Sequence, residues 1–175
     1  TSAGRIPTDL GFRVFVDELM DNIPPLLEIK KRAIRDLKNK INEDQLYQAV
    51  SLLSRSSNNI SFATLPNRHQ AYFLGLSNML REPEFQNMAQ AYTVVKILED
   101  SYNFCDLLEN LDINEQIKIF IGRENIIPEI QSCSLIATRF ELPEIGNGVI
   151  GILGPTRMNY GYNIGLIEYI RDSFK

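Results

Sequence analysis

Histidine is the side chain best suited to moving protons near neutral pH, and this sequence contains one, His69. A serine or cysteine nucleophile needs such a base within hydrogen-bonding reach. His69 follows Pro66, Asn67 and Arg68, a combination that is typical of a turn. We therefore interpret His69 as a surface turn residue, and we do not expect the chain to be an enzyme.

Metal and cofactor chemistry also lack a suitable set of residues. The two cysteines, Cys105 and Cys133, and the one histidine do not have the spacing of zinc ligands. Neighbouring acids such as Asp17 and Glu18 are typical of a solvated helix face rather than of an acid–base pair. Neither the phosphate-loop pattern nor the dinucleotide pattern occurs. We expect no metal and no cofactor, and two buried thiols in a reducing cytoplasm.

Basic residues gather between residues 30 and 40, where Asp36 is the only acid. Two interpretations remain open. This charge lies close to DNA held by another domain, with Lys30, Lys31 and Arg32 as DNA-proximal candidates. Alternatively, it is the solvated side of an amphipathic helix, whose alkyl stems cover apolar surface.

The segment Gly154–Tyr160 is expected to join a strand to a helix. Asn159 is a good N-cap, and a helix N-terminus beside Arg157 can bind an anion. Thr156, Arg157 and Asn159 are therefore a candidate anion or ligand site. The alternative is a structural elbow, in which Arg157 pairs with a nearby carboxylate.

Composition fits one packed domain with a helical extension, since 44% of the 175 residues are hydrophobic and 23% are charged. A net charge of −4 argues against nucleic-acid binding by this segment alone. Its apolar runs are far shorter than the ~20 residues of a membrane span, and its start does not resemble a signal peptide. We expect a cytoplasmic location without membrane contact, and a piece of a longer chain, because Thr1 replaces an initiator Met.

Helical periodicity dominates the first 55 residues. Thr8 is the expected N-cap of a first helix, which ends at Pro24 and Pro25. A second helix is expected to carry the basic run, and a third is expected over about residues 43–53, followed by a loop over 54–59. We interpret residues 8–55 as a helical arm, after a connector at residues 1–7.

Alternation with period two begins at Ile60. Strands are expected over residues 60–65, 70–76, 117–121, 134–141 and 148–153. Helices are expected from Pro83, over about 103–111 and at the C-terminus. The helix from Pro83 is expected to bury one apolar stripe: Phe85, Met88, Ala89, Tyr92, Val95 and Leu98. Gly146-Asn147-Gly148 is a hairpin-turn signal, and the tight connection there favours antiparallel pairing. Residues 56–175 are thus expected to form an α+β domain, an antiparallel sheet flanked by helices.

Four blocks of the chain resemble, in order, the heat-inducible transcription repressor family HrcA. The first is TSAGRIPTDLGFRVFVDEL at residues 1–19, and the last is IGILGPTRMNYGYNIGLIEYI at residues 150–170. Between them lie GLSNMLREPEF at residues 75–85, and IGREN with CSL at 121–125 and 133–135. Because the blocks span the chain in family order, it is identified as similar to that family along its whole length.

The resemblance implies a repressor whose N-terminal winged-helix domain binds an inverted-repeat operator upstream of chaperone operons. Residues 1–7 would be the exit from that domain, which makes Arg5 a further DNA-proximal candidate. The remainder would form the family's GAF-like regulatory domain. Its activity would depend on the GroEL chaperonin, which helps the repressor to stay folded and for which unfolded proteins compete.

One departure from the family concerns dimerisation. Family members usually carry a long dimerisation insertion in the GAF-like domain, whereas here residues 60–66 are followed almost at once by residues 72–78. A palindromic operator still requires a two-fold symmetric protein, so we expect a homodimer. The substitute contacts that we expect are in the first helix: Phe12, Phe15, Val16 and Leu19.

Two functions remain open: the regulatory and dimerisation part of a heat-shock repressor, and a small-ligand sensor domain of another transcription regulator, since GAF-like folds often hold ligands. A sizeable apolar pocket with a few convergent polar groups would favour the sensor. Marginal stability near the growth temperature would favour the heat-shock repressor.

Overall fold

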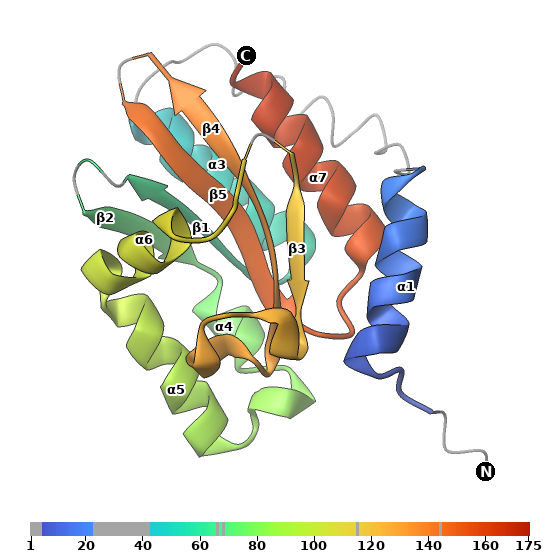
Figure 1. Ribbon diagram of the computed structural model, residues 1–175. Helices are drawn as coiled ribbons and strands as arrows, with labels where there is room; N and C mark the ends of the chain where they lie inside the picture. Colours follow the sequence, from blue (N-terminus) through green and yellow to red (C-terminus); the bar gives the residue numbers. More distant parts are fainter. Residues whose placement is uncertain (1–4, 23–42, 66, 68, 115, 144) are drawn as a thin grey trace.

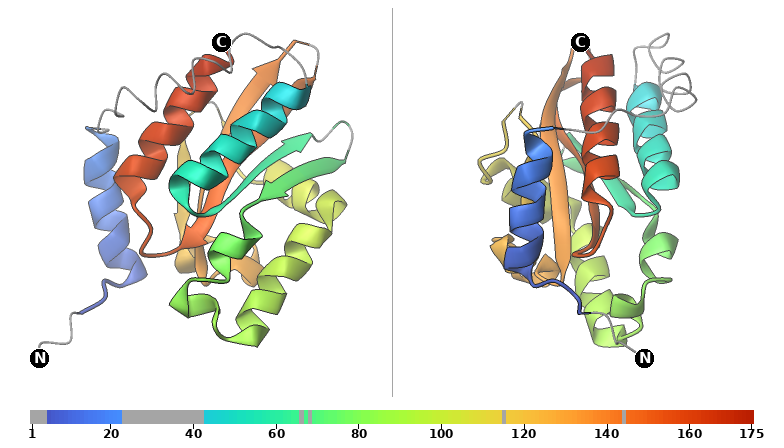
Figure 2. Two further views of the ribbon diagram at one scale, coloured as in Figure 1. Left: turned by 180° about the vertical axis from the view of Figure 1, so that it is seen from behind. Right: turned by 90° about the vertical axis from the view of Figure 1, so that its right-hand side faces the viewer.

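A five-stranded antiparallel sheet with the strand order β2-β1-β5-β4-β3 forms the centre of the protein (Figure 1). The computed structural model describes residues 5–22, 43–65, 67, 69–114, 116–143 and 145–175. Helices cover both faces of the sheet, with α3 and α7 on one face and α5 and α6 on the other (Figure 2). The expected α+β class and the antiparallel sheet flanked by helices are confirmed.

The strands are β1 (Ile60–Leu65), β2 (Gln70–Leu74), β3 (Lys118–Ile121), β4 (Cys133–Leu142) and β5 (Gly146–Pro155). The long β4–β5 hairpin is paired from Cys133 opposite Pro155 to Leu142 opposite Gly146. In the β1–β2 hairpin Leu65 pairs with Gln70, so the connection is short and no large insertion separates these strands.

The helices are α1 (Asp9–Met20), α3 (Glu43–Ser57), α4 (Leu76–Met79), α5 (Met88–Glu99), α6 (Ser101–Glu109) and α7 (Tyr160–Ser173). Short 3-10 helices are η3 (Pro83–Phe85), η4 (Gly122–Glu124) and η5 (Pro128–Ile130). The helix α1 lies beside α7 at the β3 edge of the sheet (Figures 1 and 2).

Each face of the sheet packs against its own apolar core, because successive side chains of a strand point to opposite faces. In β4, Ile136 belongs to the core shared with α3, α7 and Val16 of α1, whereas Leu135 belongs to the core under α5 and α6. The central strands therefore lack the polar alternation of a half-exposed sheet, and β1 is buried along its whole length.

The expected loop over residues 54–59 is wrong, because α3 continues to Ser57. Serine and asparagine favour loops locally, but packing overrides that preference, since Ser54 is buried. The helix ends where Asn58 adopts a left-handed φ of 54° and donates its N–H to the Ser54 carbonyl at 3.0 Å.

The apolar stripe expected for the helix from Pro83 is only partly correct: Phe85 and Leu98 are buried and Val95 is partly buried, whereas Met88, Ala89 and Tyr92 are exposed. Asn87 caps the Ala89 N–H at 3.0 Å, so α5 begins at Met88 and Pro83 belongs to the separate η3. The side chains that α5 buries are Ala91, Val94, Ile97 and Leu98, while Met88 and Tyr92 are 82% and 65% exposed. Apolar residues occur nearly all round this helix, so its sequence is compatible with more than one apolar stripe facing the core.

Smaller boundary errors have local causes. The strand expected to reach Leu76 ends at Leu74, because Gly75 adopts a φ of +93° where a Cβ would lie 2.3 Å from the Asn59 carbonyl oxygen. Gly146-Asn147-Gly148 lies in β5 rather than in the turn, which precedes it. The expected second helix, with Lys30, Lys31 and Arg32, lies outside the described residues.

Candidate functional site

The inner face of α1 is packed onto the regulatory body. Thr8 begins the helix as expected, with its hydroxyl accepting the Gly11 N–H at 3.2 Å. Val16 is fully buried, and the ring centroids of Phe12 and Tyr160 are 5.9 Å apart. Leu19 is half-buried against the same core. Three of the four expected dimer contacts therefore make contacts within the chain, and Val16 has no surface left for a partner.

An arginine joins this helix to a part of the chain that is distant in sequence. Arg13 donates to both oxygens of Glu124, from Nε to Oε1 at 2.9 Å and from Nη2 to Oε2 at 2.5 Å. It also donates to the Ile119 carbonyl at 2.6 Å and to Asp17 at 3.1 Å. Such a two-pronged arginine–carboxylate pair fixes orientation as well as distance. It therefore sets how α1 lies against β3 and η4.

The pair is charged on both sides. The hydrogen bonds to Glu124 raise the pKa of Arg13 further above its ordinary value, although burial opposes this. Burial alone would raise the pKa of Glu124, but hydrogen bonds from Arg13 and from the Ile121 N–H outweigh it, and the pKa is lowered. Glu124 thus remains a carboxylate at neutral pH.

A second contact between α1 and η4 requires a glycine. The Arg123 N–H donates to Asp9 at 3.1 Å. Gly122 has a φ of +55°, and a Cβ on it would lie 2.2 Å from the Asp9 carboxylate oxygen. Any other residue would have to adopt a left-handed backbone and displace the Asp9 carboxylate.

Tyr160, the first residue of α7, packs against the inner face of α1 at Phe12. Its hydroxyl donates to the Thr156 carbonyl at 2.6 Å and lies 2.7 Å from the Ser134 hydroxyl. Burial raises the pKa of Tyr160 to about 12, so the phenol stays protonated at neutral pH. The contact links the start of α7 to β4, which indicates a structural role.

The outer face of α1 is apolar and exposed. Its exposed fractions are 72% for Leu10 and 55% for Val14, and Ile6 just before the helix is 76% exposed. Of the expected dimer contacts, Phe15 alone is half exposed, at the edge of the inner face rather than beside Leu10 and Val14. Arg5 is also exposed, in the non-helical segment that leads into α1.

The segment before α7 has the geometry of a structural elbow. Arg157 donates from Nε to Glu84 at 2.6 Å and from Nη2 to Glu82. Asn159 is the N-cap, as expected, and accepts the Tyr162 N–H at 3.2 Å. Because two carboxylates already match the guanidinium, Thr156, Arg157 and Asn159 do not form a ready anion site.

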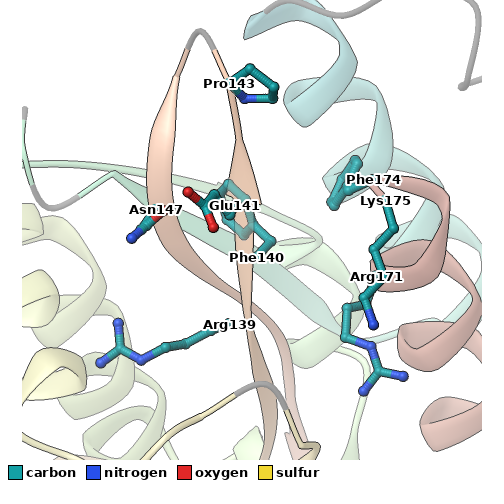
Figure 3. Close-up of a pocket in the computed structure, with 8 residues that line it drawn as sticks. All are labelled: Arg139, Phe140, Glu141, Pro143, Asn147, Arg171, Phe174 and Lys175. Carbon is teal, nitrogen blue, oxygen red and sulfur yellow. The ribbon is translucent and has the colours of Figure 1, made fainter.

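A cavity of about 500 Å³ lies between the end of the β4–β5 hairpin and the C-terminal end of α7 (Figure 3). The rings of Phe140 and Phe174 line it, with centroids 5.7 Å apart. Arg171 of α7 and Lys175, which follows α7, also line it, but both contact Asp172. Arg139 points away from α7, towards Glu109 and the Ile113 carbonyl (Figure 3).

The remaining candidates are structural. His69 has a left-handed φ of 48° in the expected turn, and its ring lies 4.6 Å from that of Tyr102. Cys105 and Cys133 are buried free thiols, as expected, and burial raises the pKa of Cys133 to about 12. Among the described residues, no three histidine, cysteine or acidic side chains are grouped to hold a metal ion. In that same part of the chain no helix is long and apolar enough to cross a membrane.

The contacts at Arg13, Glu124, Asp9 and Gly122 were not anticipated from the sequence. The two members of the ion pair are 111 positions apart, and each stands among ordinary polar helix or loop residues. The only available signal was that both fall in blocks shared with the family, IGREN and the opening segment.

Comparison with known proteins agrees with this description. The family described as HrcA protein C terminal domain matches residues 18–164. One similar solved structure is described as the crystal structure of a hypothetical protein at 2.2 Å resolution. It has a TM-score of 0.77 and 15% sequence identity, over 99% of this chain and 79% of that chain. At this identity, the likeness shows a common fold.

Proposed function

Because the chain belongs to the HrcA C-terminal domain family, a family of non-enzymatic regulatory domains, we propose that it is the regulatory and dimerisation part of a heat-shock transcription repressor. In the complete repressor, a winged-helix domain before Arg5 binds an inverted-repeat operator and represses chaperone operons. The protein acts in the cytoplasm as a homodimer. The family match over residues 18–164 is the observation that carries this proposal.

The attachment of α1 supports a role in orienting a preceding domain. Arg5 and the residues after it lead directly into α1, and α1 is fixed to the body by Arg13, Asp9 and the buried Val16. A DNA-binding domain before Arg5 is therefore connected to a helix of defined direction. Loosening of the body on heating is transmitted to that domain through the same contacts.

The proposed chaperonin partner requires a domain that heat can unfold. Two hydroxyl or amide oxygens, Ser61 Oγ and Asn163 Oδ1, are buried without a hydrogen-bond partner among the described residues. A buried polar group left unpaired typically costs about 1–3 kcal/mol. A change of about 1–2 kcal/mol alters the folded fraction several-fold in a marginally stable protein. Unfolded repressor then competes with other clients for GroEL.

The test is operator binding by the complete repressor, with its winged-helix domain, across temperature and with or without purified GroEL. We expect binding that is lost on warming to be restored by the chaperonin. A matched operator with a scrambled half-site serves as the control. If the complete protein binds no inverted-repeat operator at any temperature, the proposal fails.

The cavity beside Phe140 and Phe174 favours a second candidate function, a small-ligand sensor domain. Its volume of about 500 Å³ is in the range of ligand pockets, and two aromatic rings line it. We rank this function second, because Arg139, Arg171 and Lys175 contact carboxylates or carbonyls of the chain rather than converging on the cavity. A screen of small apolar acids by thermal shift, with Phe174→Ala as the control, tests it.

A further inference from the structure

The outer face of α1 carries a stripe that no described part of the chain covers. We call Ile6, Leu10 and Val14 the outer stripe. Leu10 and Val14 are four residues apart, so they lie on one side of the helix. The buried Val16 marks the opposite side. Each member of the stripe is more than half exposed, which is unusual for three neighbouring large apolar side chains.

Charge is distributed unevenly along the stripe. Arg5 stands before its N-terminal end, while Glu18 and Asp21 lie on the same side of α1 beyond Val14. All three residues are exposed, and in the described part of the chain none of them forms an ion pair. Asp17 differs, because it is already paired with Arg13 at 3.1 Å.

We infer that the outer stripe binds the same stripe of a second copy of this chain, with the two α1 helices antiparallel across a two-fold axis. This inference rests on the homodimer of the proposed function and names its interface. An antiparallel arrangement places Leu10 opposite the Val14 of the other copy and brings Arg5 near the other copy's Glu18 and Asp21. A parallel arrangement places like charges together, which is unfavourable.

Self-pairing accounts for both the apolar and the charged features. A two-fold interface uses the same patch on both subunits, so one patch must contain complementary halves. The outer stripe meets that condition, since its positive and negative ends flank an apolar centre. In the antiparallel arrangement the dipoles of the two helices also point in opposite directions, so that the positive end of each lies near the negative end of the other, which is favourable.

The first experiment is sedimentation equilibrium of the 175-residue chain, in the unchanged form and with Leu10→Asp. We expect a monomer–dimer equilibrium that Leu10→Asp weakens at least tenfold. Met88→Asp is the matched control, because Met88 is 82% exposed on α5 and lies outside the stripe. Circular dichroism melts should show that neither exposed substitution unfolds the domain.

The second experiment tests orientation by charge exchange. Arg5→Glu and Glu18→Arg should each weaken the dimer, and the double variant should restore it, because opposite charges again face each other. An unchanged chain that is monomeric at all concentrations overturns the inference, and so does a dimer that Leu10→Asp leaves intact. A double variant no tighter than the single variants overturns the antiparallel arrangement. No DNA or chaperonin is present, so these outcomes are separate from the failure of operator binding.

Discussion

Two arginines of this protein each hold together distant parts of the chain, yet they differ in consequence. Arg13 bonds both oxygens of Glu124 and also the Ile119 carbonyl, and its side chain is 26% exposed. Arg157 bonds Glu84 and Glu82, with its side chain 42% exposed. The first contact sits beside the buried Val16 and fixes a whole helix, whereas the second ties a surface elbow to η3.

The comparison shows that a local sequence signal and structural importance are separate matters. Arg157 stood out because a helix N-terminus beside an arginine can bind anions. Arg13 gave no such signal, because its partner Glu124 is distant in sequence and only the fold brings them together. Substitutions in the two regions should therefore differ in their effects on stability.

Gly122→Val should have the largest effect. The new side chain meets the Asp9 carboxylate and requires a left-handed backbone, so we expect a loss of about 2–3 kcal/mol in the free energy of unfolding. Urea denaturation measures this loss. Gly11→Ala in the exposed first turn of α1 is the control. Its Cβ would lie 3.3 Å from the Cβ of the exposed Pro7, so we expect a change of less than about 1 kcal/mol. A Gly122→Val protein as stable as the unchanged chain would show that the Asp9 contact is unimportant.

The Arg13–Glu124 and Arg157–Glu84 ion pairs should differ in how much stability is lost when the glutamate is replaced by glutamine. Glu124→Gln should lower the free energy of unfolding by about 1–2 kcal/mol, because it weakens the hydrogen bonds to the partly buried Arg13 guanidinium. This value allows for solvent screening of the partly exposed pair. Glu84→Gln should cost less than about 1 kcal/mol, since Glu82 still pairs with the more exposed Arg157. Parallel urea titrations of both variants test the order, and equal losses would remove the distinction between the regions.

The Glu124 contact should also depend on pH. Its pKa is lowered in the folded state from the ordinary value of 4.5. The stabilisation is therefore fully present above pH 4.5 and is lost as the pH falls through the lower folded-state value. The difference in unfolding free energy between the unchanged chain and Glu124→Gln should shrink over this acidic range. A difference that stays constant down to the acid transition would contradict the pKa direction.

The smallest effect concerns anions at the elbow. Since Glu82 and Glu84 already match Arg157, phosphate should shift the thermal midpoint of the unchanged chain and of Arg157→Ala equally. Differential scanning fluorimetry over increasing phosphate concentration, with chloride at matched ionic strength, measures this. A shift that disappears only in Arg157→Ala would restore the anion-site hypothesis.

Local features of the fold were predictable from the sequence. The strand over residues 60–65, the Thr8 and Asn159 caps, the turn at His69 and the buried cysteines were all predicted correctly. These features depend on a residue and its near neighbours. The five strands in an antiparallel sheet followed from the same local patterns.

Features that tertiary packing decides were not predictable in this way. Ser54 is helical because the core covers it. The helix α5 buries Ala91, Val94 and Ile97 beside the expected Leu98, and it leaves the expected Met88 and Tyr92 exposed. Val16 was expected at a dimer interface, but an apolar helix residue has the same signature whether it contacts its own body or a partner. The direction of α1 depends on Glu124, which no short-range pattern could pair with Arg13.

The most direct test follows unfolding and operator release in the same sample of complete repressor as temperature rises. Tyrosine fluorescence or circular dichroism reports the domain, and fluorescence anisotropy of a labelled operator reports DNA. The account predicts that the two midpoints coincide and that Ser61→Ala, which removes an unpaired buried hydroxyl, raises both together. Operator release well below the unfolding midpoint, with the domain still folded, would contradict a heat response based on the marginal stability of this domain.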